Sequence, residues 1–319
     1  MAVLRTPEDR FDGLADFPYE AQYIEVTARD IEPLRMAYVD EGPRDGPVVL
    51  LLHGQPTWSY LYRHVIAALA AAGMRVIAPD HIGYGRSDKP GAATDYTFKR
   101  HVVWVESFVT GLDLRDVTLV AQDWGGPIGL SALARIPHRF ARIVLANTIL
   151  HTCDPDLAGK LAWAAHGIDD GRVVLQEALV DYLLHYARAP EIVPSRYVDA
   201  VAGPLSAEVK AAYDAPFPDP SYTAGLRQMT ALLPLTRNDP GAAIGRATMA
   251  ALREWTKPLL TAYSDGDPAT RGWDAVFRAA TPGAAAFEPV IIAGAGHFLQ
   301  ETHGAELAAA ITAFVQASS

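Results

Sequence analysis

Short apolar runs alternate with longer amphipathic stretches along most of this chain, and this alternation limits the possible folds more than any other feature. Eight runs rich in Val, Ile and Leu predict β-strands, at residues 23–30, 35–42, 47–54, 74–80, 117–123, 142–148, 258–264 and 287–297. Apolar residues at helical spacing predict helices over 59–73, 98–114, 126–136 and 273–283. Strand-helix alternation implies right-handed crossovers between parallel strands. We therefore predict an α/β fold with a mostly parallel, eight-stranded sheet flanked by helices, preceded by an antiparallel N-terminal pair.

The alternation stops after "VLANTIL" (residues 144–150) and resumes near residue 258. The interval contains helical patterns, such as 156–167 and 173–187, separated by proline-rich pieces. A structureless loop of this length would be unusual in a compact domain. We therefore predict a helical cap at residues 150–228, inserted after the sixth strand, and an α/β core made of residues 1–149 and 229–319. Such a cap would cover the carboxyl edge of the sheet, where open α/β sheets bind ligands.

The amino-acid composition excludes several classes of protein. The chain has 319 residues, 50% of them hydrophobic, which is enough for a large core. A formal net charge of -10 without a basic run lacks the electrostatic signature of nucleic-acid binding. The single cysteine, Cys153, excludes an internal disulfide framework. Residues 1–20 lack the apolar core of a signal peptide, and no segment reaches membrane-spanning length. We expect a cytoplasmic protein without nucleic-acid or membrane partners.

A glycine-containing turn, "AQDWGGPIGL", follows the strand predicted at 117–123. A tight strand-to-helix turn of this kind exposes the side chain at its apex, which is the geometry of a nucleophile elbow. The apex residue here is Asp123, although an aspartate at a strand end is ordinarily a helix N-cap. The Trp-Gly-Gly sequence and the upstream turn "LLHGQP" favour a nucleophile. His297 follows the last strand in "GAGHF", in the nucleophile, acid, histidine order of such hydrolases.

A histidine base requires a carboxylate on its other ring nitrogen, which holds the tautomer and stabilises the imidazolium. Asp267 in "YSDGDPATRG" is the first candidate, followed by Asp265, and Asp154 after the sixth strand is the third. The chain contains neither a nucleotide-binding glycine fingerprint nor a His and carboxylate cluster with metal-ligand spacing. We expect neither a cofactor nor a metal.

Together with "HGQPTWSYLYR", "APDHIGYGRSDKP", "APFPDPSYTAG" and "AGAGHFLQE", these motifs resemble the haloalkane dehalogenases over about residues 20–318. The resemblance implies the α/β-hydrolase fold with a helical cap. It also implies that Asp123 displaces a halide and becomes an alkyl ester, which water activated by His297 then hydrolyses. A carboxylate suits this role because it needs no deprotonation at neutral pH. By the same resemblance, the backbone amides of Gln55 and Trp124 form the oxyanion hole.

The resemblance further implies two tryptophans that bind the departing halide. An indole N–H donates a hydrogen bond without accepting one, which suits an anion in an apolar pocket. Trp124 matches the first of these tryptophans, and Trp163 in "KLAWAAHG" matches the second. Some members place the second tryptophan further along, where this chain has Leu175. The partners implied are a small apolar halogenated substrate, water and a halide ion.

Two alternatives stay open at this point. An epoxide hydrolase shares the aspartate nucleophile and activates the ring oxygen with tyrosine hydroxyls, for which Tyr182, Tyr186 and Tyr197 are available. A catalytically silent binding protein would use the capped pocket alone, but it would not need the nucleophile, the histidine and the acid together. The sequence leaves the natural substrate and the oligomeric state open.

Overall fold

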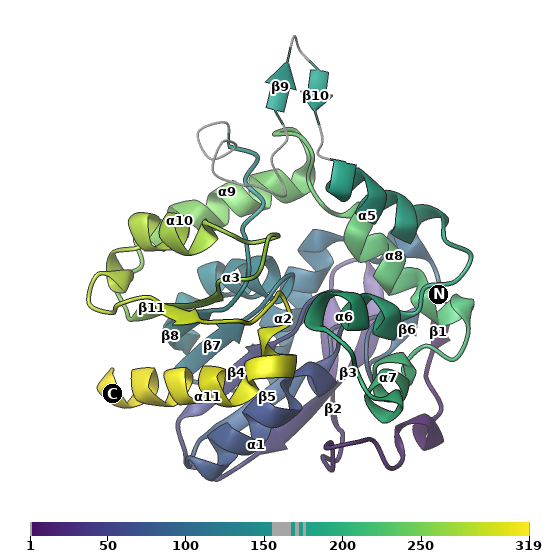
Figure 1. Cartoon of the computed structure of the whole chain (residues 1–319), viewed down its shortest axis with the longest axis horizontal. Helices are drawn as coiled ribbons and strands as arrows, with labels where there is room; N and C mark the ends of the chain where they lie inside the picture. Colours follow the sequence, from purple (N-terminus) through teal and green to yellow (C-terminus); the bar gives the residue numbers. More distant parts are fainter. Residues whose placement is uncertain (1, 155–166, 170–171, 175–176, 319) are drawn as a thin grey trace.

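The computed structural model describes residues 2–154, 167–169, 172–174 and 177–318, and Figure 1 shows their arrangement around a central twisted sheet. The eight strands of this sheet are β2 (Gln22–Ala28), β3 (Ile31–Glu41), β4 (Val48–Leu52), β5 (Arg75–Pro79), β7 (Val117–Ala121), β8 (Phe140–Leu145), β11 (Leu259–Ser264) and β12 (Val290–Ile292). Their order is β12-β11-β8-β7-β4-β5-β3-β2. Within this sheet, the pairs β2·β3 and β3·β5 are antiparallel and the other pairs are parallel. The predicted eight-stranded, mostly parallel sheet is confirmed.

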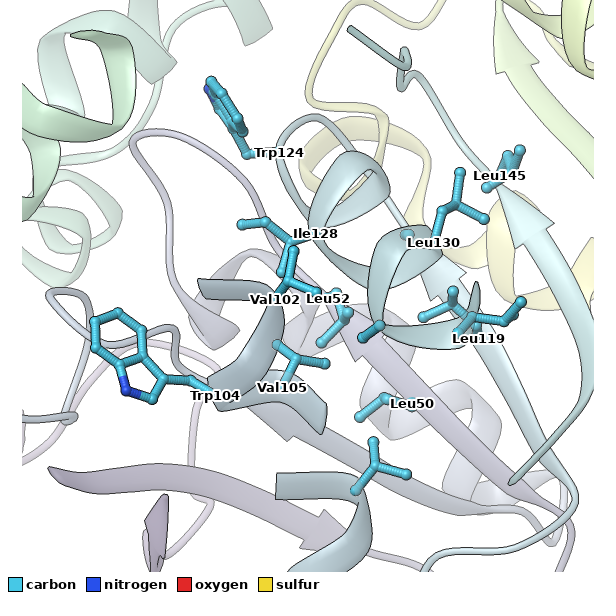
Figure 2. Close-up of a cluster of buried hydrophobic side chains, with 14 of the residues drawn as sticks. Leu50, Leu52, Val102, Trp104, Val105, Leu119, Trp124, Ile128, Leu130 and Leu145 are labelled. Atoms are coloured by element: carbon cyan, nitrogen blue, oxygen red, sulfur yellow. The ribbon is translucent and has the colours of Figure 1, made fainter. Parts of the chain in front are cut away.

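Alternate residues of the central strands enter two separate hydrophobic clusters, because successive side chains of a strand point to opposite faces. Leu50 and Leu52 of β4 face one cluster, whereas Val49 and Leu51 face the other. The first cluster is covered by α2 (Phe98–Gly111), α3 (Gly125–Arg135), α9 (Pro240–Arg253) and α10 (Trp273–Ala280). Figure 2 shows Leu50, Leu52 and Leu119 of the sheet among Val102, Val105, Ile128 and Leu130 of α2 and α3.

The opposite face is covered by α1 (Arg63–Ala71) and α11 (Leu299–Ala317), which lie side by side. Helix α11 is not among the helices predicted from the sequence, because small alanines give its faces little hydrophobic contrast. A buried ion pair joins these two helices: Arg63 Nη2 lies 2.6 Å from Glu301 Oε1. The Tyr213 hydroxyl donates to Glu301 Oε2 at 2.5 Å and links the pair to α7 (Ala207–Asp214).

The segment between β8 and β11 contains the helices α5 (Glu177–Arg188), α6 (Pro194–Ala202), α7 (Ala207–Asp214) and α8 (Ala224–Ala231), followed by α9. The helical prediction for 173–187 was wrong at its start, because Arg172–Val174 form strand β10, paired with β9 (Gly167–Asp169). The β-branched pair Val173 and Val174 favours extended backbone. Helix α8 crosses the predicted cap limit at residue 228, and the division into core and cap stays a prediction. In the described ranges, no helix is long and apolar enough to cross a bilayer.

Candidate active site

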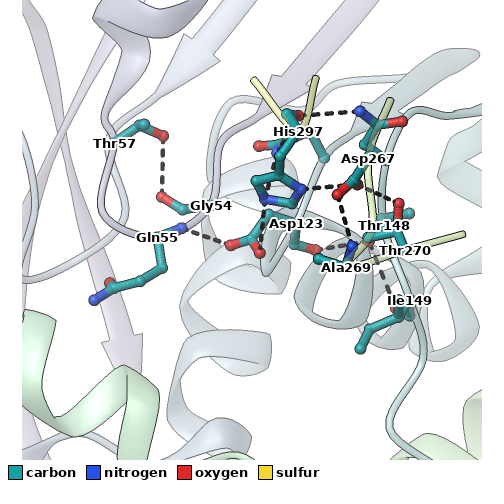
Figure 3. Close-up of polar contacts among 12 residues, drawn as sticks. Gly54, Gln55, Thr57, Asp123, Thr148, Ile149, Asp267, Ala269, Thr270 and His297 are labelled. Carbon is teal, nitrogen blue, oxygen red and sulfur yellow. Dashed lines mark hydrogen bonds and ion pairs between the residues drawn. The ribbon is translucent and has the colours of Figure 1, made fainter. Parts of the chain in front are cut away.

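Four loops at one edge of the sheet carry the predicted site residues. They follow β4, β7, β11 and β12, and they contain Gln55, Asp123, Asp267 and His297 respectively. These strands are parallel to one another, so their carboxyl ends meet at the same edge. Residues far apart in the chain are therefore brought together, as Figure 3 shows.

The backbone at Asp123 adopts the left-handed region, with a φ of 48°, which is uncommon and strained for a residue with a side chain. Its amide donates to the Asn147 carbonyl at 3.0 Å. Its own carbonyl accepts from the Gly126 amide at 3.0 Å and from the Thr148 hydroxyl at 2.6 Å. A Cβ at Gly125 would lie 2.2 Å from a backbone carbonyl oxygen of β4. This close approach requires glycine, and it gives the tight strand-to-helix turn expected from the sequence, with Asp123 at its apex.

His297 lies between two carboxylates. Its Nε2 is 3.4 Å from Oδ2 of Asp123, and its Nδ1 is 2.9 Å from Oδ2 of Asp267 (Figure 3). The Asp267 carboxylate also accepts from the Ala269 amide at 2.8 Å and from the Thr270 hydroxyl at 2.5 Å. Since an ionised carboxylate only accepts, Nδ1 carries a proton and the ring orientation is defined.

Burial alone would lower the pKa of the His297 imidazole. The charge of Asp267 and the hydrogen bonds to Asp123 and Asp267 outweigh this effect and raise the pKa to about 10. Burial would likewise raise the pKa of Asp267, but the charge of His297 and the hydrogen bonds that it accepts hold it below its ordinary value. At neutral pH the site therefore holds an imidazolium between two carboxylates.

The two alternative acid partners do not contact the histidine. Asp265 is exposed and accepts from the Gly294 amide at 2.8 Å. Asp154 lies 3.8 Å from the guanidinium of Arg237. Of the three candidate carboxylates, the structure brings Asp267 alone to the Nδ1 of His297.

One predicted oxyanion donor contacts Asp123 directly: the Gln55 amide donates to Asp123 Oδ1 at 2.7 Å (Figure 3). Its turn is held by His53, whose Nδ1 lies 2.9 Å from the Gly54 carbonyl and whose Nε2 accepts from the His81 amide at 3.0 Å. Burial lowers the pKa of His53 to about 4, so its ring is neutral and has a shaping role. The Trp124 amide, the other predicted donor, stays a prediction.

A small cavity lies next to Asp123, with Tyr182 of α5 and Tyr197 of α6 in its wall. The described residues that line it are Gln55, Asp123, Trp124, Ile149, His151, Tyr182, Tyr197, Thr230, Leu233, Ala269, Thr270 and His297. Apolar side chains and aromatic rings make up much of this wall, which suits an apolar substrate. Trp124 lines the cavity together with Asp123, its neighbour in the chain. The second predicted halide donor, Trp163, lies outside the described residues.

Sequence reasoning missed two side chains at this site. His151 lines the cavity and packs on Trp124, with ring centroids 4.9 Å apart. Gln122 contacts the imidazole of His297 at 3.1 Å. Gln122 lies inside the motif "AQDWGGPIGL", next to Asp123, and this position was a usable signal, whereas His151 belongs to no quoted motif. Of the three tyrosines weighed for an epoxide hydrolase, Tyr182 and Tyr197 line the cavity, whereas Tyr186 is buried and packs on Tyr182.

The parallel sheet, the strained aspartate turn after β7 and the buried histidine-carboxylate pair define an α/β hydrolase. A family model described as the alpha/beta hydrolase fold matches residues 47–177. The chain is 44% identical over 316 residues to a haloalkane dehalogenase of Psychrobacter cryohalolentis, covering 99% of this chain and 98% of the relative. It is also 44% identical over 319 residues to haloalkane dehalogenase 1 of Mycobacterium tuberculosis, covering both chains completely.

Comparison with solved structures leads to the same family. The tetrameric structure of a haloalkane dehalogenase from Paraglaciecola agarilytica NO2 superposes with a TM-score of 0.83 at 34% identity, covering 97% of both chains. The chain therefore belongs to the haloalkane dehalogenases, hydrolases that act on carbon-halide bonds. The resemblance inferred from the motifs is confirmed, and the epoxide hydrolase and binding-protein alternatives are not retained.

Proposed function

We propose that this enzyme converts small halogenated alkanes to an alcohol, a halide ion and a proton through a covalent ester on Asp123. The observation that supports this proposal is that each carboxylate oxygen of Asp123 has a different partner. One accepts from the Gln55 amide at 2.7 Å, and the other lies 3.4 Å from Nε2 of His297. The carboxylate thus meets an oxyanion donor, a base and an apolar cavity at once.

In the first step, a carboxylate oxygen of Asp123 forms a bond to the halogen-bearing carbon. The carbon-halogen bond breaks and its electron pair leaves with the halide. No proton moves, so this step needs no base. The indole N–H of Trp124 would stabilise the halide, because a fixed donor in an apolar cavity is effective where negative charge develops. We propose Trp163 as the second donor to the halide.

Ester formation also prepares the second step. The negative charge of Asp123 is one reason why the pKa of His297 is high, and the ester removes that charge. The pKa of the imidazole should then fall, so that Nε2 loses its proton to solvent and can accept a proton from water. Asp267 keeps the Nδ1 proton in place throughout, so that Nε2 is the nitrogen that acts as base.

In that second step, the oxygen of a water molecule bonds to the ester carbonyl carbon while a proton of the water passes to Nε2 of His297. The amides of Gln55 and Trp124 would hold the oxyanion. Collapse breaks the bond between the carbonyl carbon and the alkoxide oxygen, and the alkoxide takes the proton from His297. The carboxylic acid left on Asp123 then passes its proton to Nε2 of His297, which restores the imidazolium and the carboxylate. The proton that Nε2 lost to solvent balances the released halide.

We also retain two broader proposals. The α/β core would comprise residues 1–149 and 229–319, with a cap at 150–228 that shapes the substrate cavity. The enzyme would act in the cytoplasm, which its single cysteine, Cys153, does not contradict.

The test of the mechanism is halide release from 1-bromobutane by the purified enzyme. The wild type should release bromide and butanol continuously, and Asp123→Ala should release none. His297→Phe should release one equivalent of bromide and then stop, with the butyl ester detectable on Asp123 by mass spectrometry. Asp154→Asn, a carboxylate change away from His297, should behave as the wild type. Continued bromide release by Asp123→Ala would refute the proposal.

A further inference from the structure

Gln122 precedes the nucleophile and is completely buried. Its side-chain amide nitrogen lies 3.2 Å from the carbonyl oxygen of His297 and 3.1 Å from Nε2 of the same residue. The side chain therefore spans the gap between the elbow and the loop after β12. It contacts the ring nitrogen that the mechanism uses.

The contact with the backbone determines which end of the amide faces the imidazole. A carbonyl oxygen only accepts hydrogen bonds, so the Gln122 nitrogen and not its oxygen must face the carbonyl of His297. An inverted amide would place two acceptors against each other. The nitrogen that faces the backbone carbonyl is also the one near Nε2, so a donor is directed at the ring.

Nε2 of His297 consequently has two neighbours with opposite requirements. The Asp123 carboxylate at 3.4 Å is an acceptor, which suits a protonated Nε2. The Gln122 amide at 3.1 Å is a donor, which suits a free lone pair on Nε2. The charge on Asp123 decides between them, and this charge disappears when the ester forms.

We propose that Gln122 is a positioning residue for ester hydrolysis, and that its amide stabilises the neutral ring of His297 with the Nε2 lone pair available to water. This inference rests on the proposed two-step mechanism. Hydrogen bonding to the neutral form of a group favours that form over the charged one. Gln122 would therefore act when Asp123 is an ester and have little influence on halide displacement.

Few other groups around His297 change their charge near neutral pH. Asp267 faces Nδ1 and is ionised. Tyr197 of α6 lies on the cavity wall, and burial raises its pKa well above neutrality. Burial lowers the pKa of His53 and of His151 to about 4. A shift in the pH dependence of ester hydrolysis between pH 6 and 10 would thus report on His297 itself.

The test uses Gln122→Met and Gln122→Glu, which keep the length of the side chain but remove or reverse the donor. Each variant is mixed with 1-bromobutane in single-turnover experiments across this pH range. Bromide release reports the first step, and decay of the butyl ester, followed by quenching and mass spectrometry, reports the second. A neutral hydrogen bond is worth about a factor of ten in an equilibrium. The rate of ester decay falls at low pH, where His297 is protonated. We therefore expect Gln122→Met to shift this acid limb of the pH profile upward by about one pH unit.

Gln122→Glu should move this limb further, because a carboxylate stabilises the imidazolium, while bromide release in both variants stays within about threefold of the wild type. Ser264→Ala is the matched control, since this hydroxyl donates to the Gly296 carbonyl and does not touch the ring. Unshifted limbs in the variants, or an equal shift in Ser264→Ala, would overturn the inference. If one variant does not fold, the other decides. A wild type that forms no ester would instead refute the mechanism.

Discussion

Replacing Asp267 with asparagine removes one charge and almost no volume, and it changes the hydrogen bonding around His297. One carboxylate oxygen receives the Nδ1 proton of His297 and the Thr270 hydroxyl, and the other receives the Ala269 amide. An asparagine has a single oxygen. If the asparagine oxygen accepts from the Ala269 amide, the NH₂ group of the asparagine faces Nδ1 of His297 and forces the ring proton onto Nε2. If the asparagine oxygen instead accepts from Nδ1, the asparagine NH₂ group and the Ala269 amide, both donors, face each other in a buried place.

Either arrangement of Asp267→Asn impairs the base. The first leaves Nε2 unable to accept a proton, and the second leaves an unsatisfied buried donor that costs about 1–3 kcal/mol. General base catalysis contributes roughly 10²–10⁴ in rate, so ester hydrolysis should slow by about that factor. Bromide release in the first turnover needs no base and should stay within a few-fold of the wild type.

The assay is rapid mixing with 1-bromobutane, in which the bromide burst and the later steady rate are measured separately. Asp267→Asn should give a full burst of one equivalent followed by a very slow steady rate. Asp265→Asn is the matched control, because this nearby carboxylate accepts from the Gly294 amide and does not contact His297. An unchanged steady rate in Asp267→Asn, or an equal loss in Asp265→Asn, would refute the assigned role of Asp267.

Three further predictions concern stability. The pKa of His297 is about 10 in the folded protein against an ordinary 6.5. The stabilisation is therefore complete below pH 6.5 and is lost as the pH rises through about 10. Thermal unfolding should show this decline, and Asp267→Asn should flatten it. Gly125→Ala should lower the urea midpoint strongly, because its Cβ would lie 2.2 Å from a backbone oxygen. The control Gly91→Ala, with its nearest neighbour atom at 3.6 Å, should be close to neutral. Glu301→Gln should cost about 3–5 kcal/mol in urea unfolding by leaving its buried arginine partner unpaired, and a loss below 1 kcal/mol would contradict this reasoning.

The strands of the sheet could be predicted because a parallel strand buried on both faces appears as a continuous apolar run. The runs "VVLLL" and "VTLVA" became β4 and β7. The secondary structure was predicted wrongly where the residues are compatible with both a helix and a strand. Val173 and Val174 precede a strongly amphipathic helix and share its apolar pattern, yet they pair with β9. Helix α11 was missed because alanines dilute its apolar face.

At the site, the predictable residues were those that end strands inside recognisable motifs. Asp123 and His297 are of this kind, and Asp267 lies soon after the strand predicted at 258–264. The contacts of Gln122 could not be predicted, because its role depends on which loop the fold places opposite it. The same holds for His151, which becomes a pocket residue only because its ring reaches Trp124.

The α/β class and the aspartate at the turn after β7 could be inferred from local periodicity and short motifs, and the same motifs carried the resemblance to the dehalogenases. The folded chain was needed to show which carboxylate lies at Nδ1 of His297 and which amide lies at Nε2. Hydrogen-bond partners and pKa shifts depend on distances of a few ångströms between segments that lie 30 to 175 residues apart in the chain. Sheet packing creates those distances, and no local pattern in the sequence contains them.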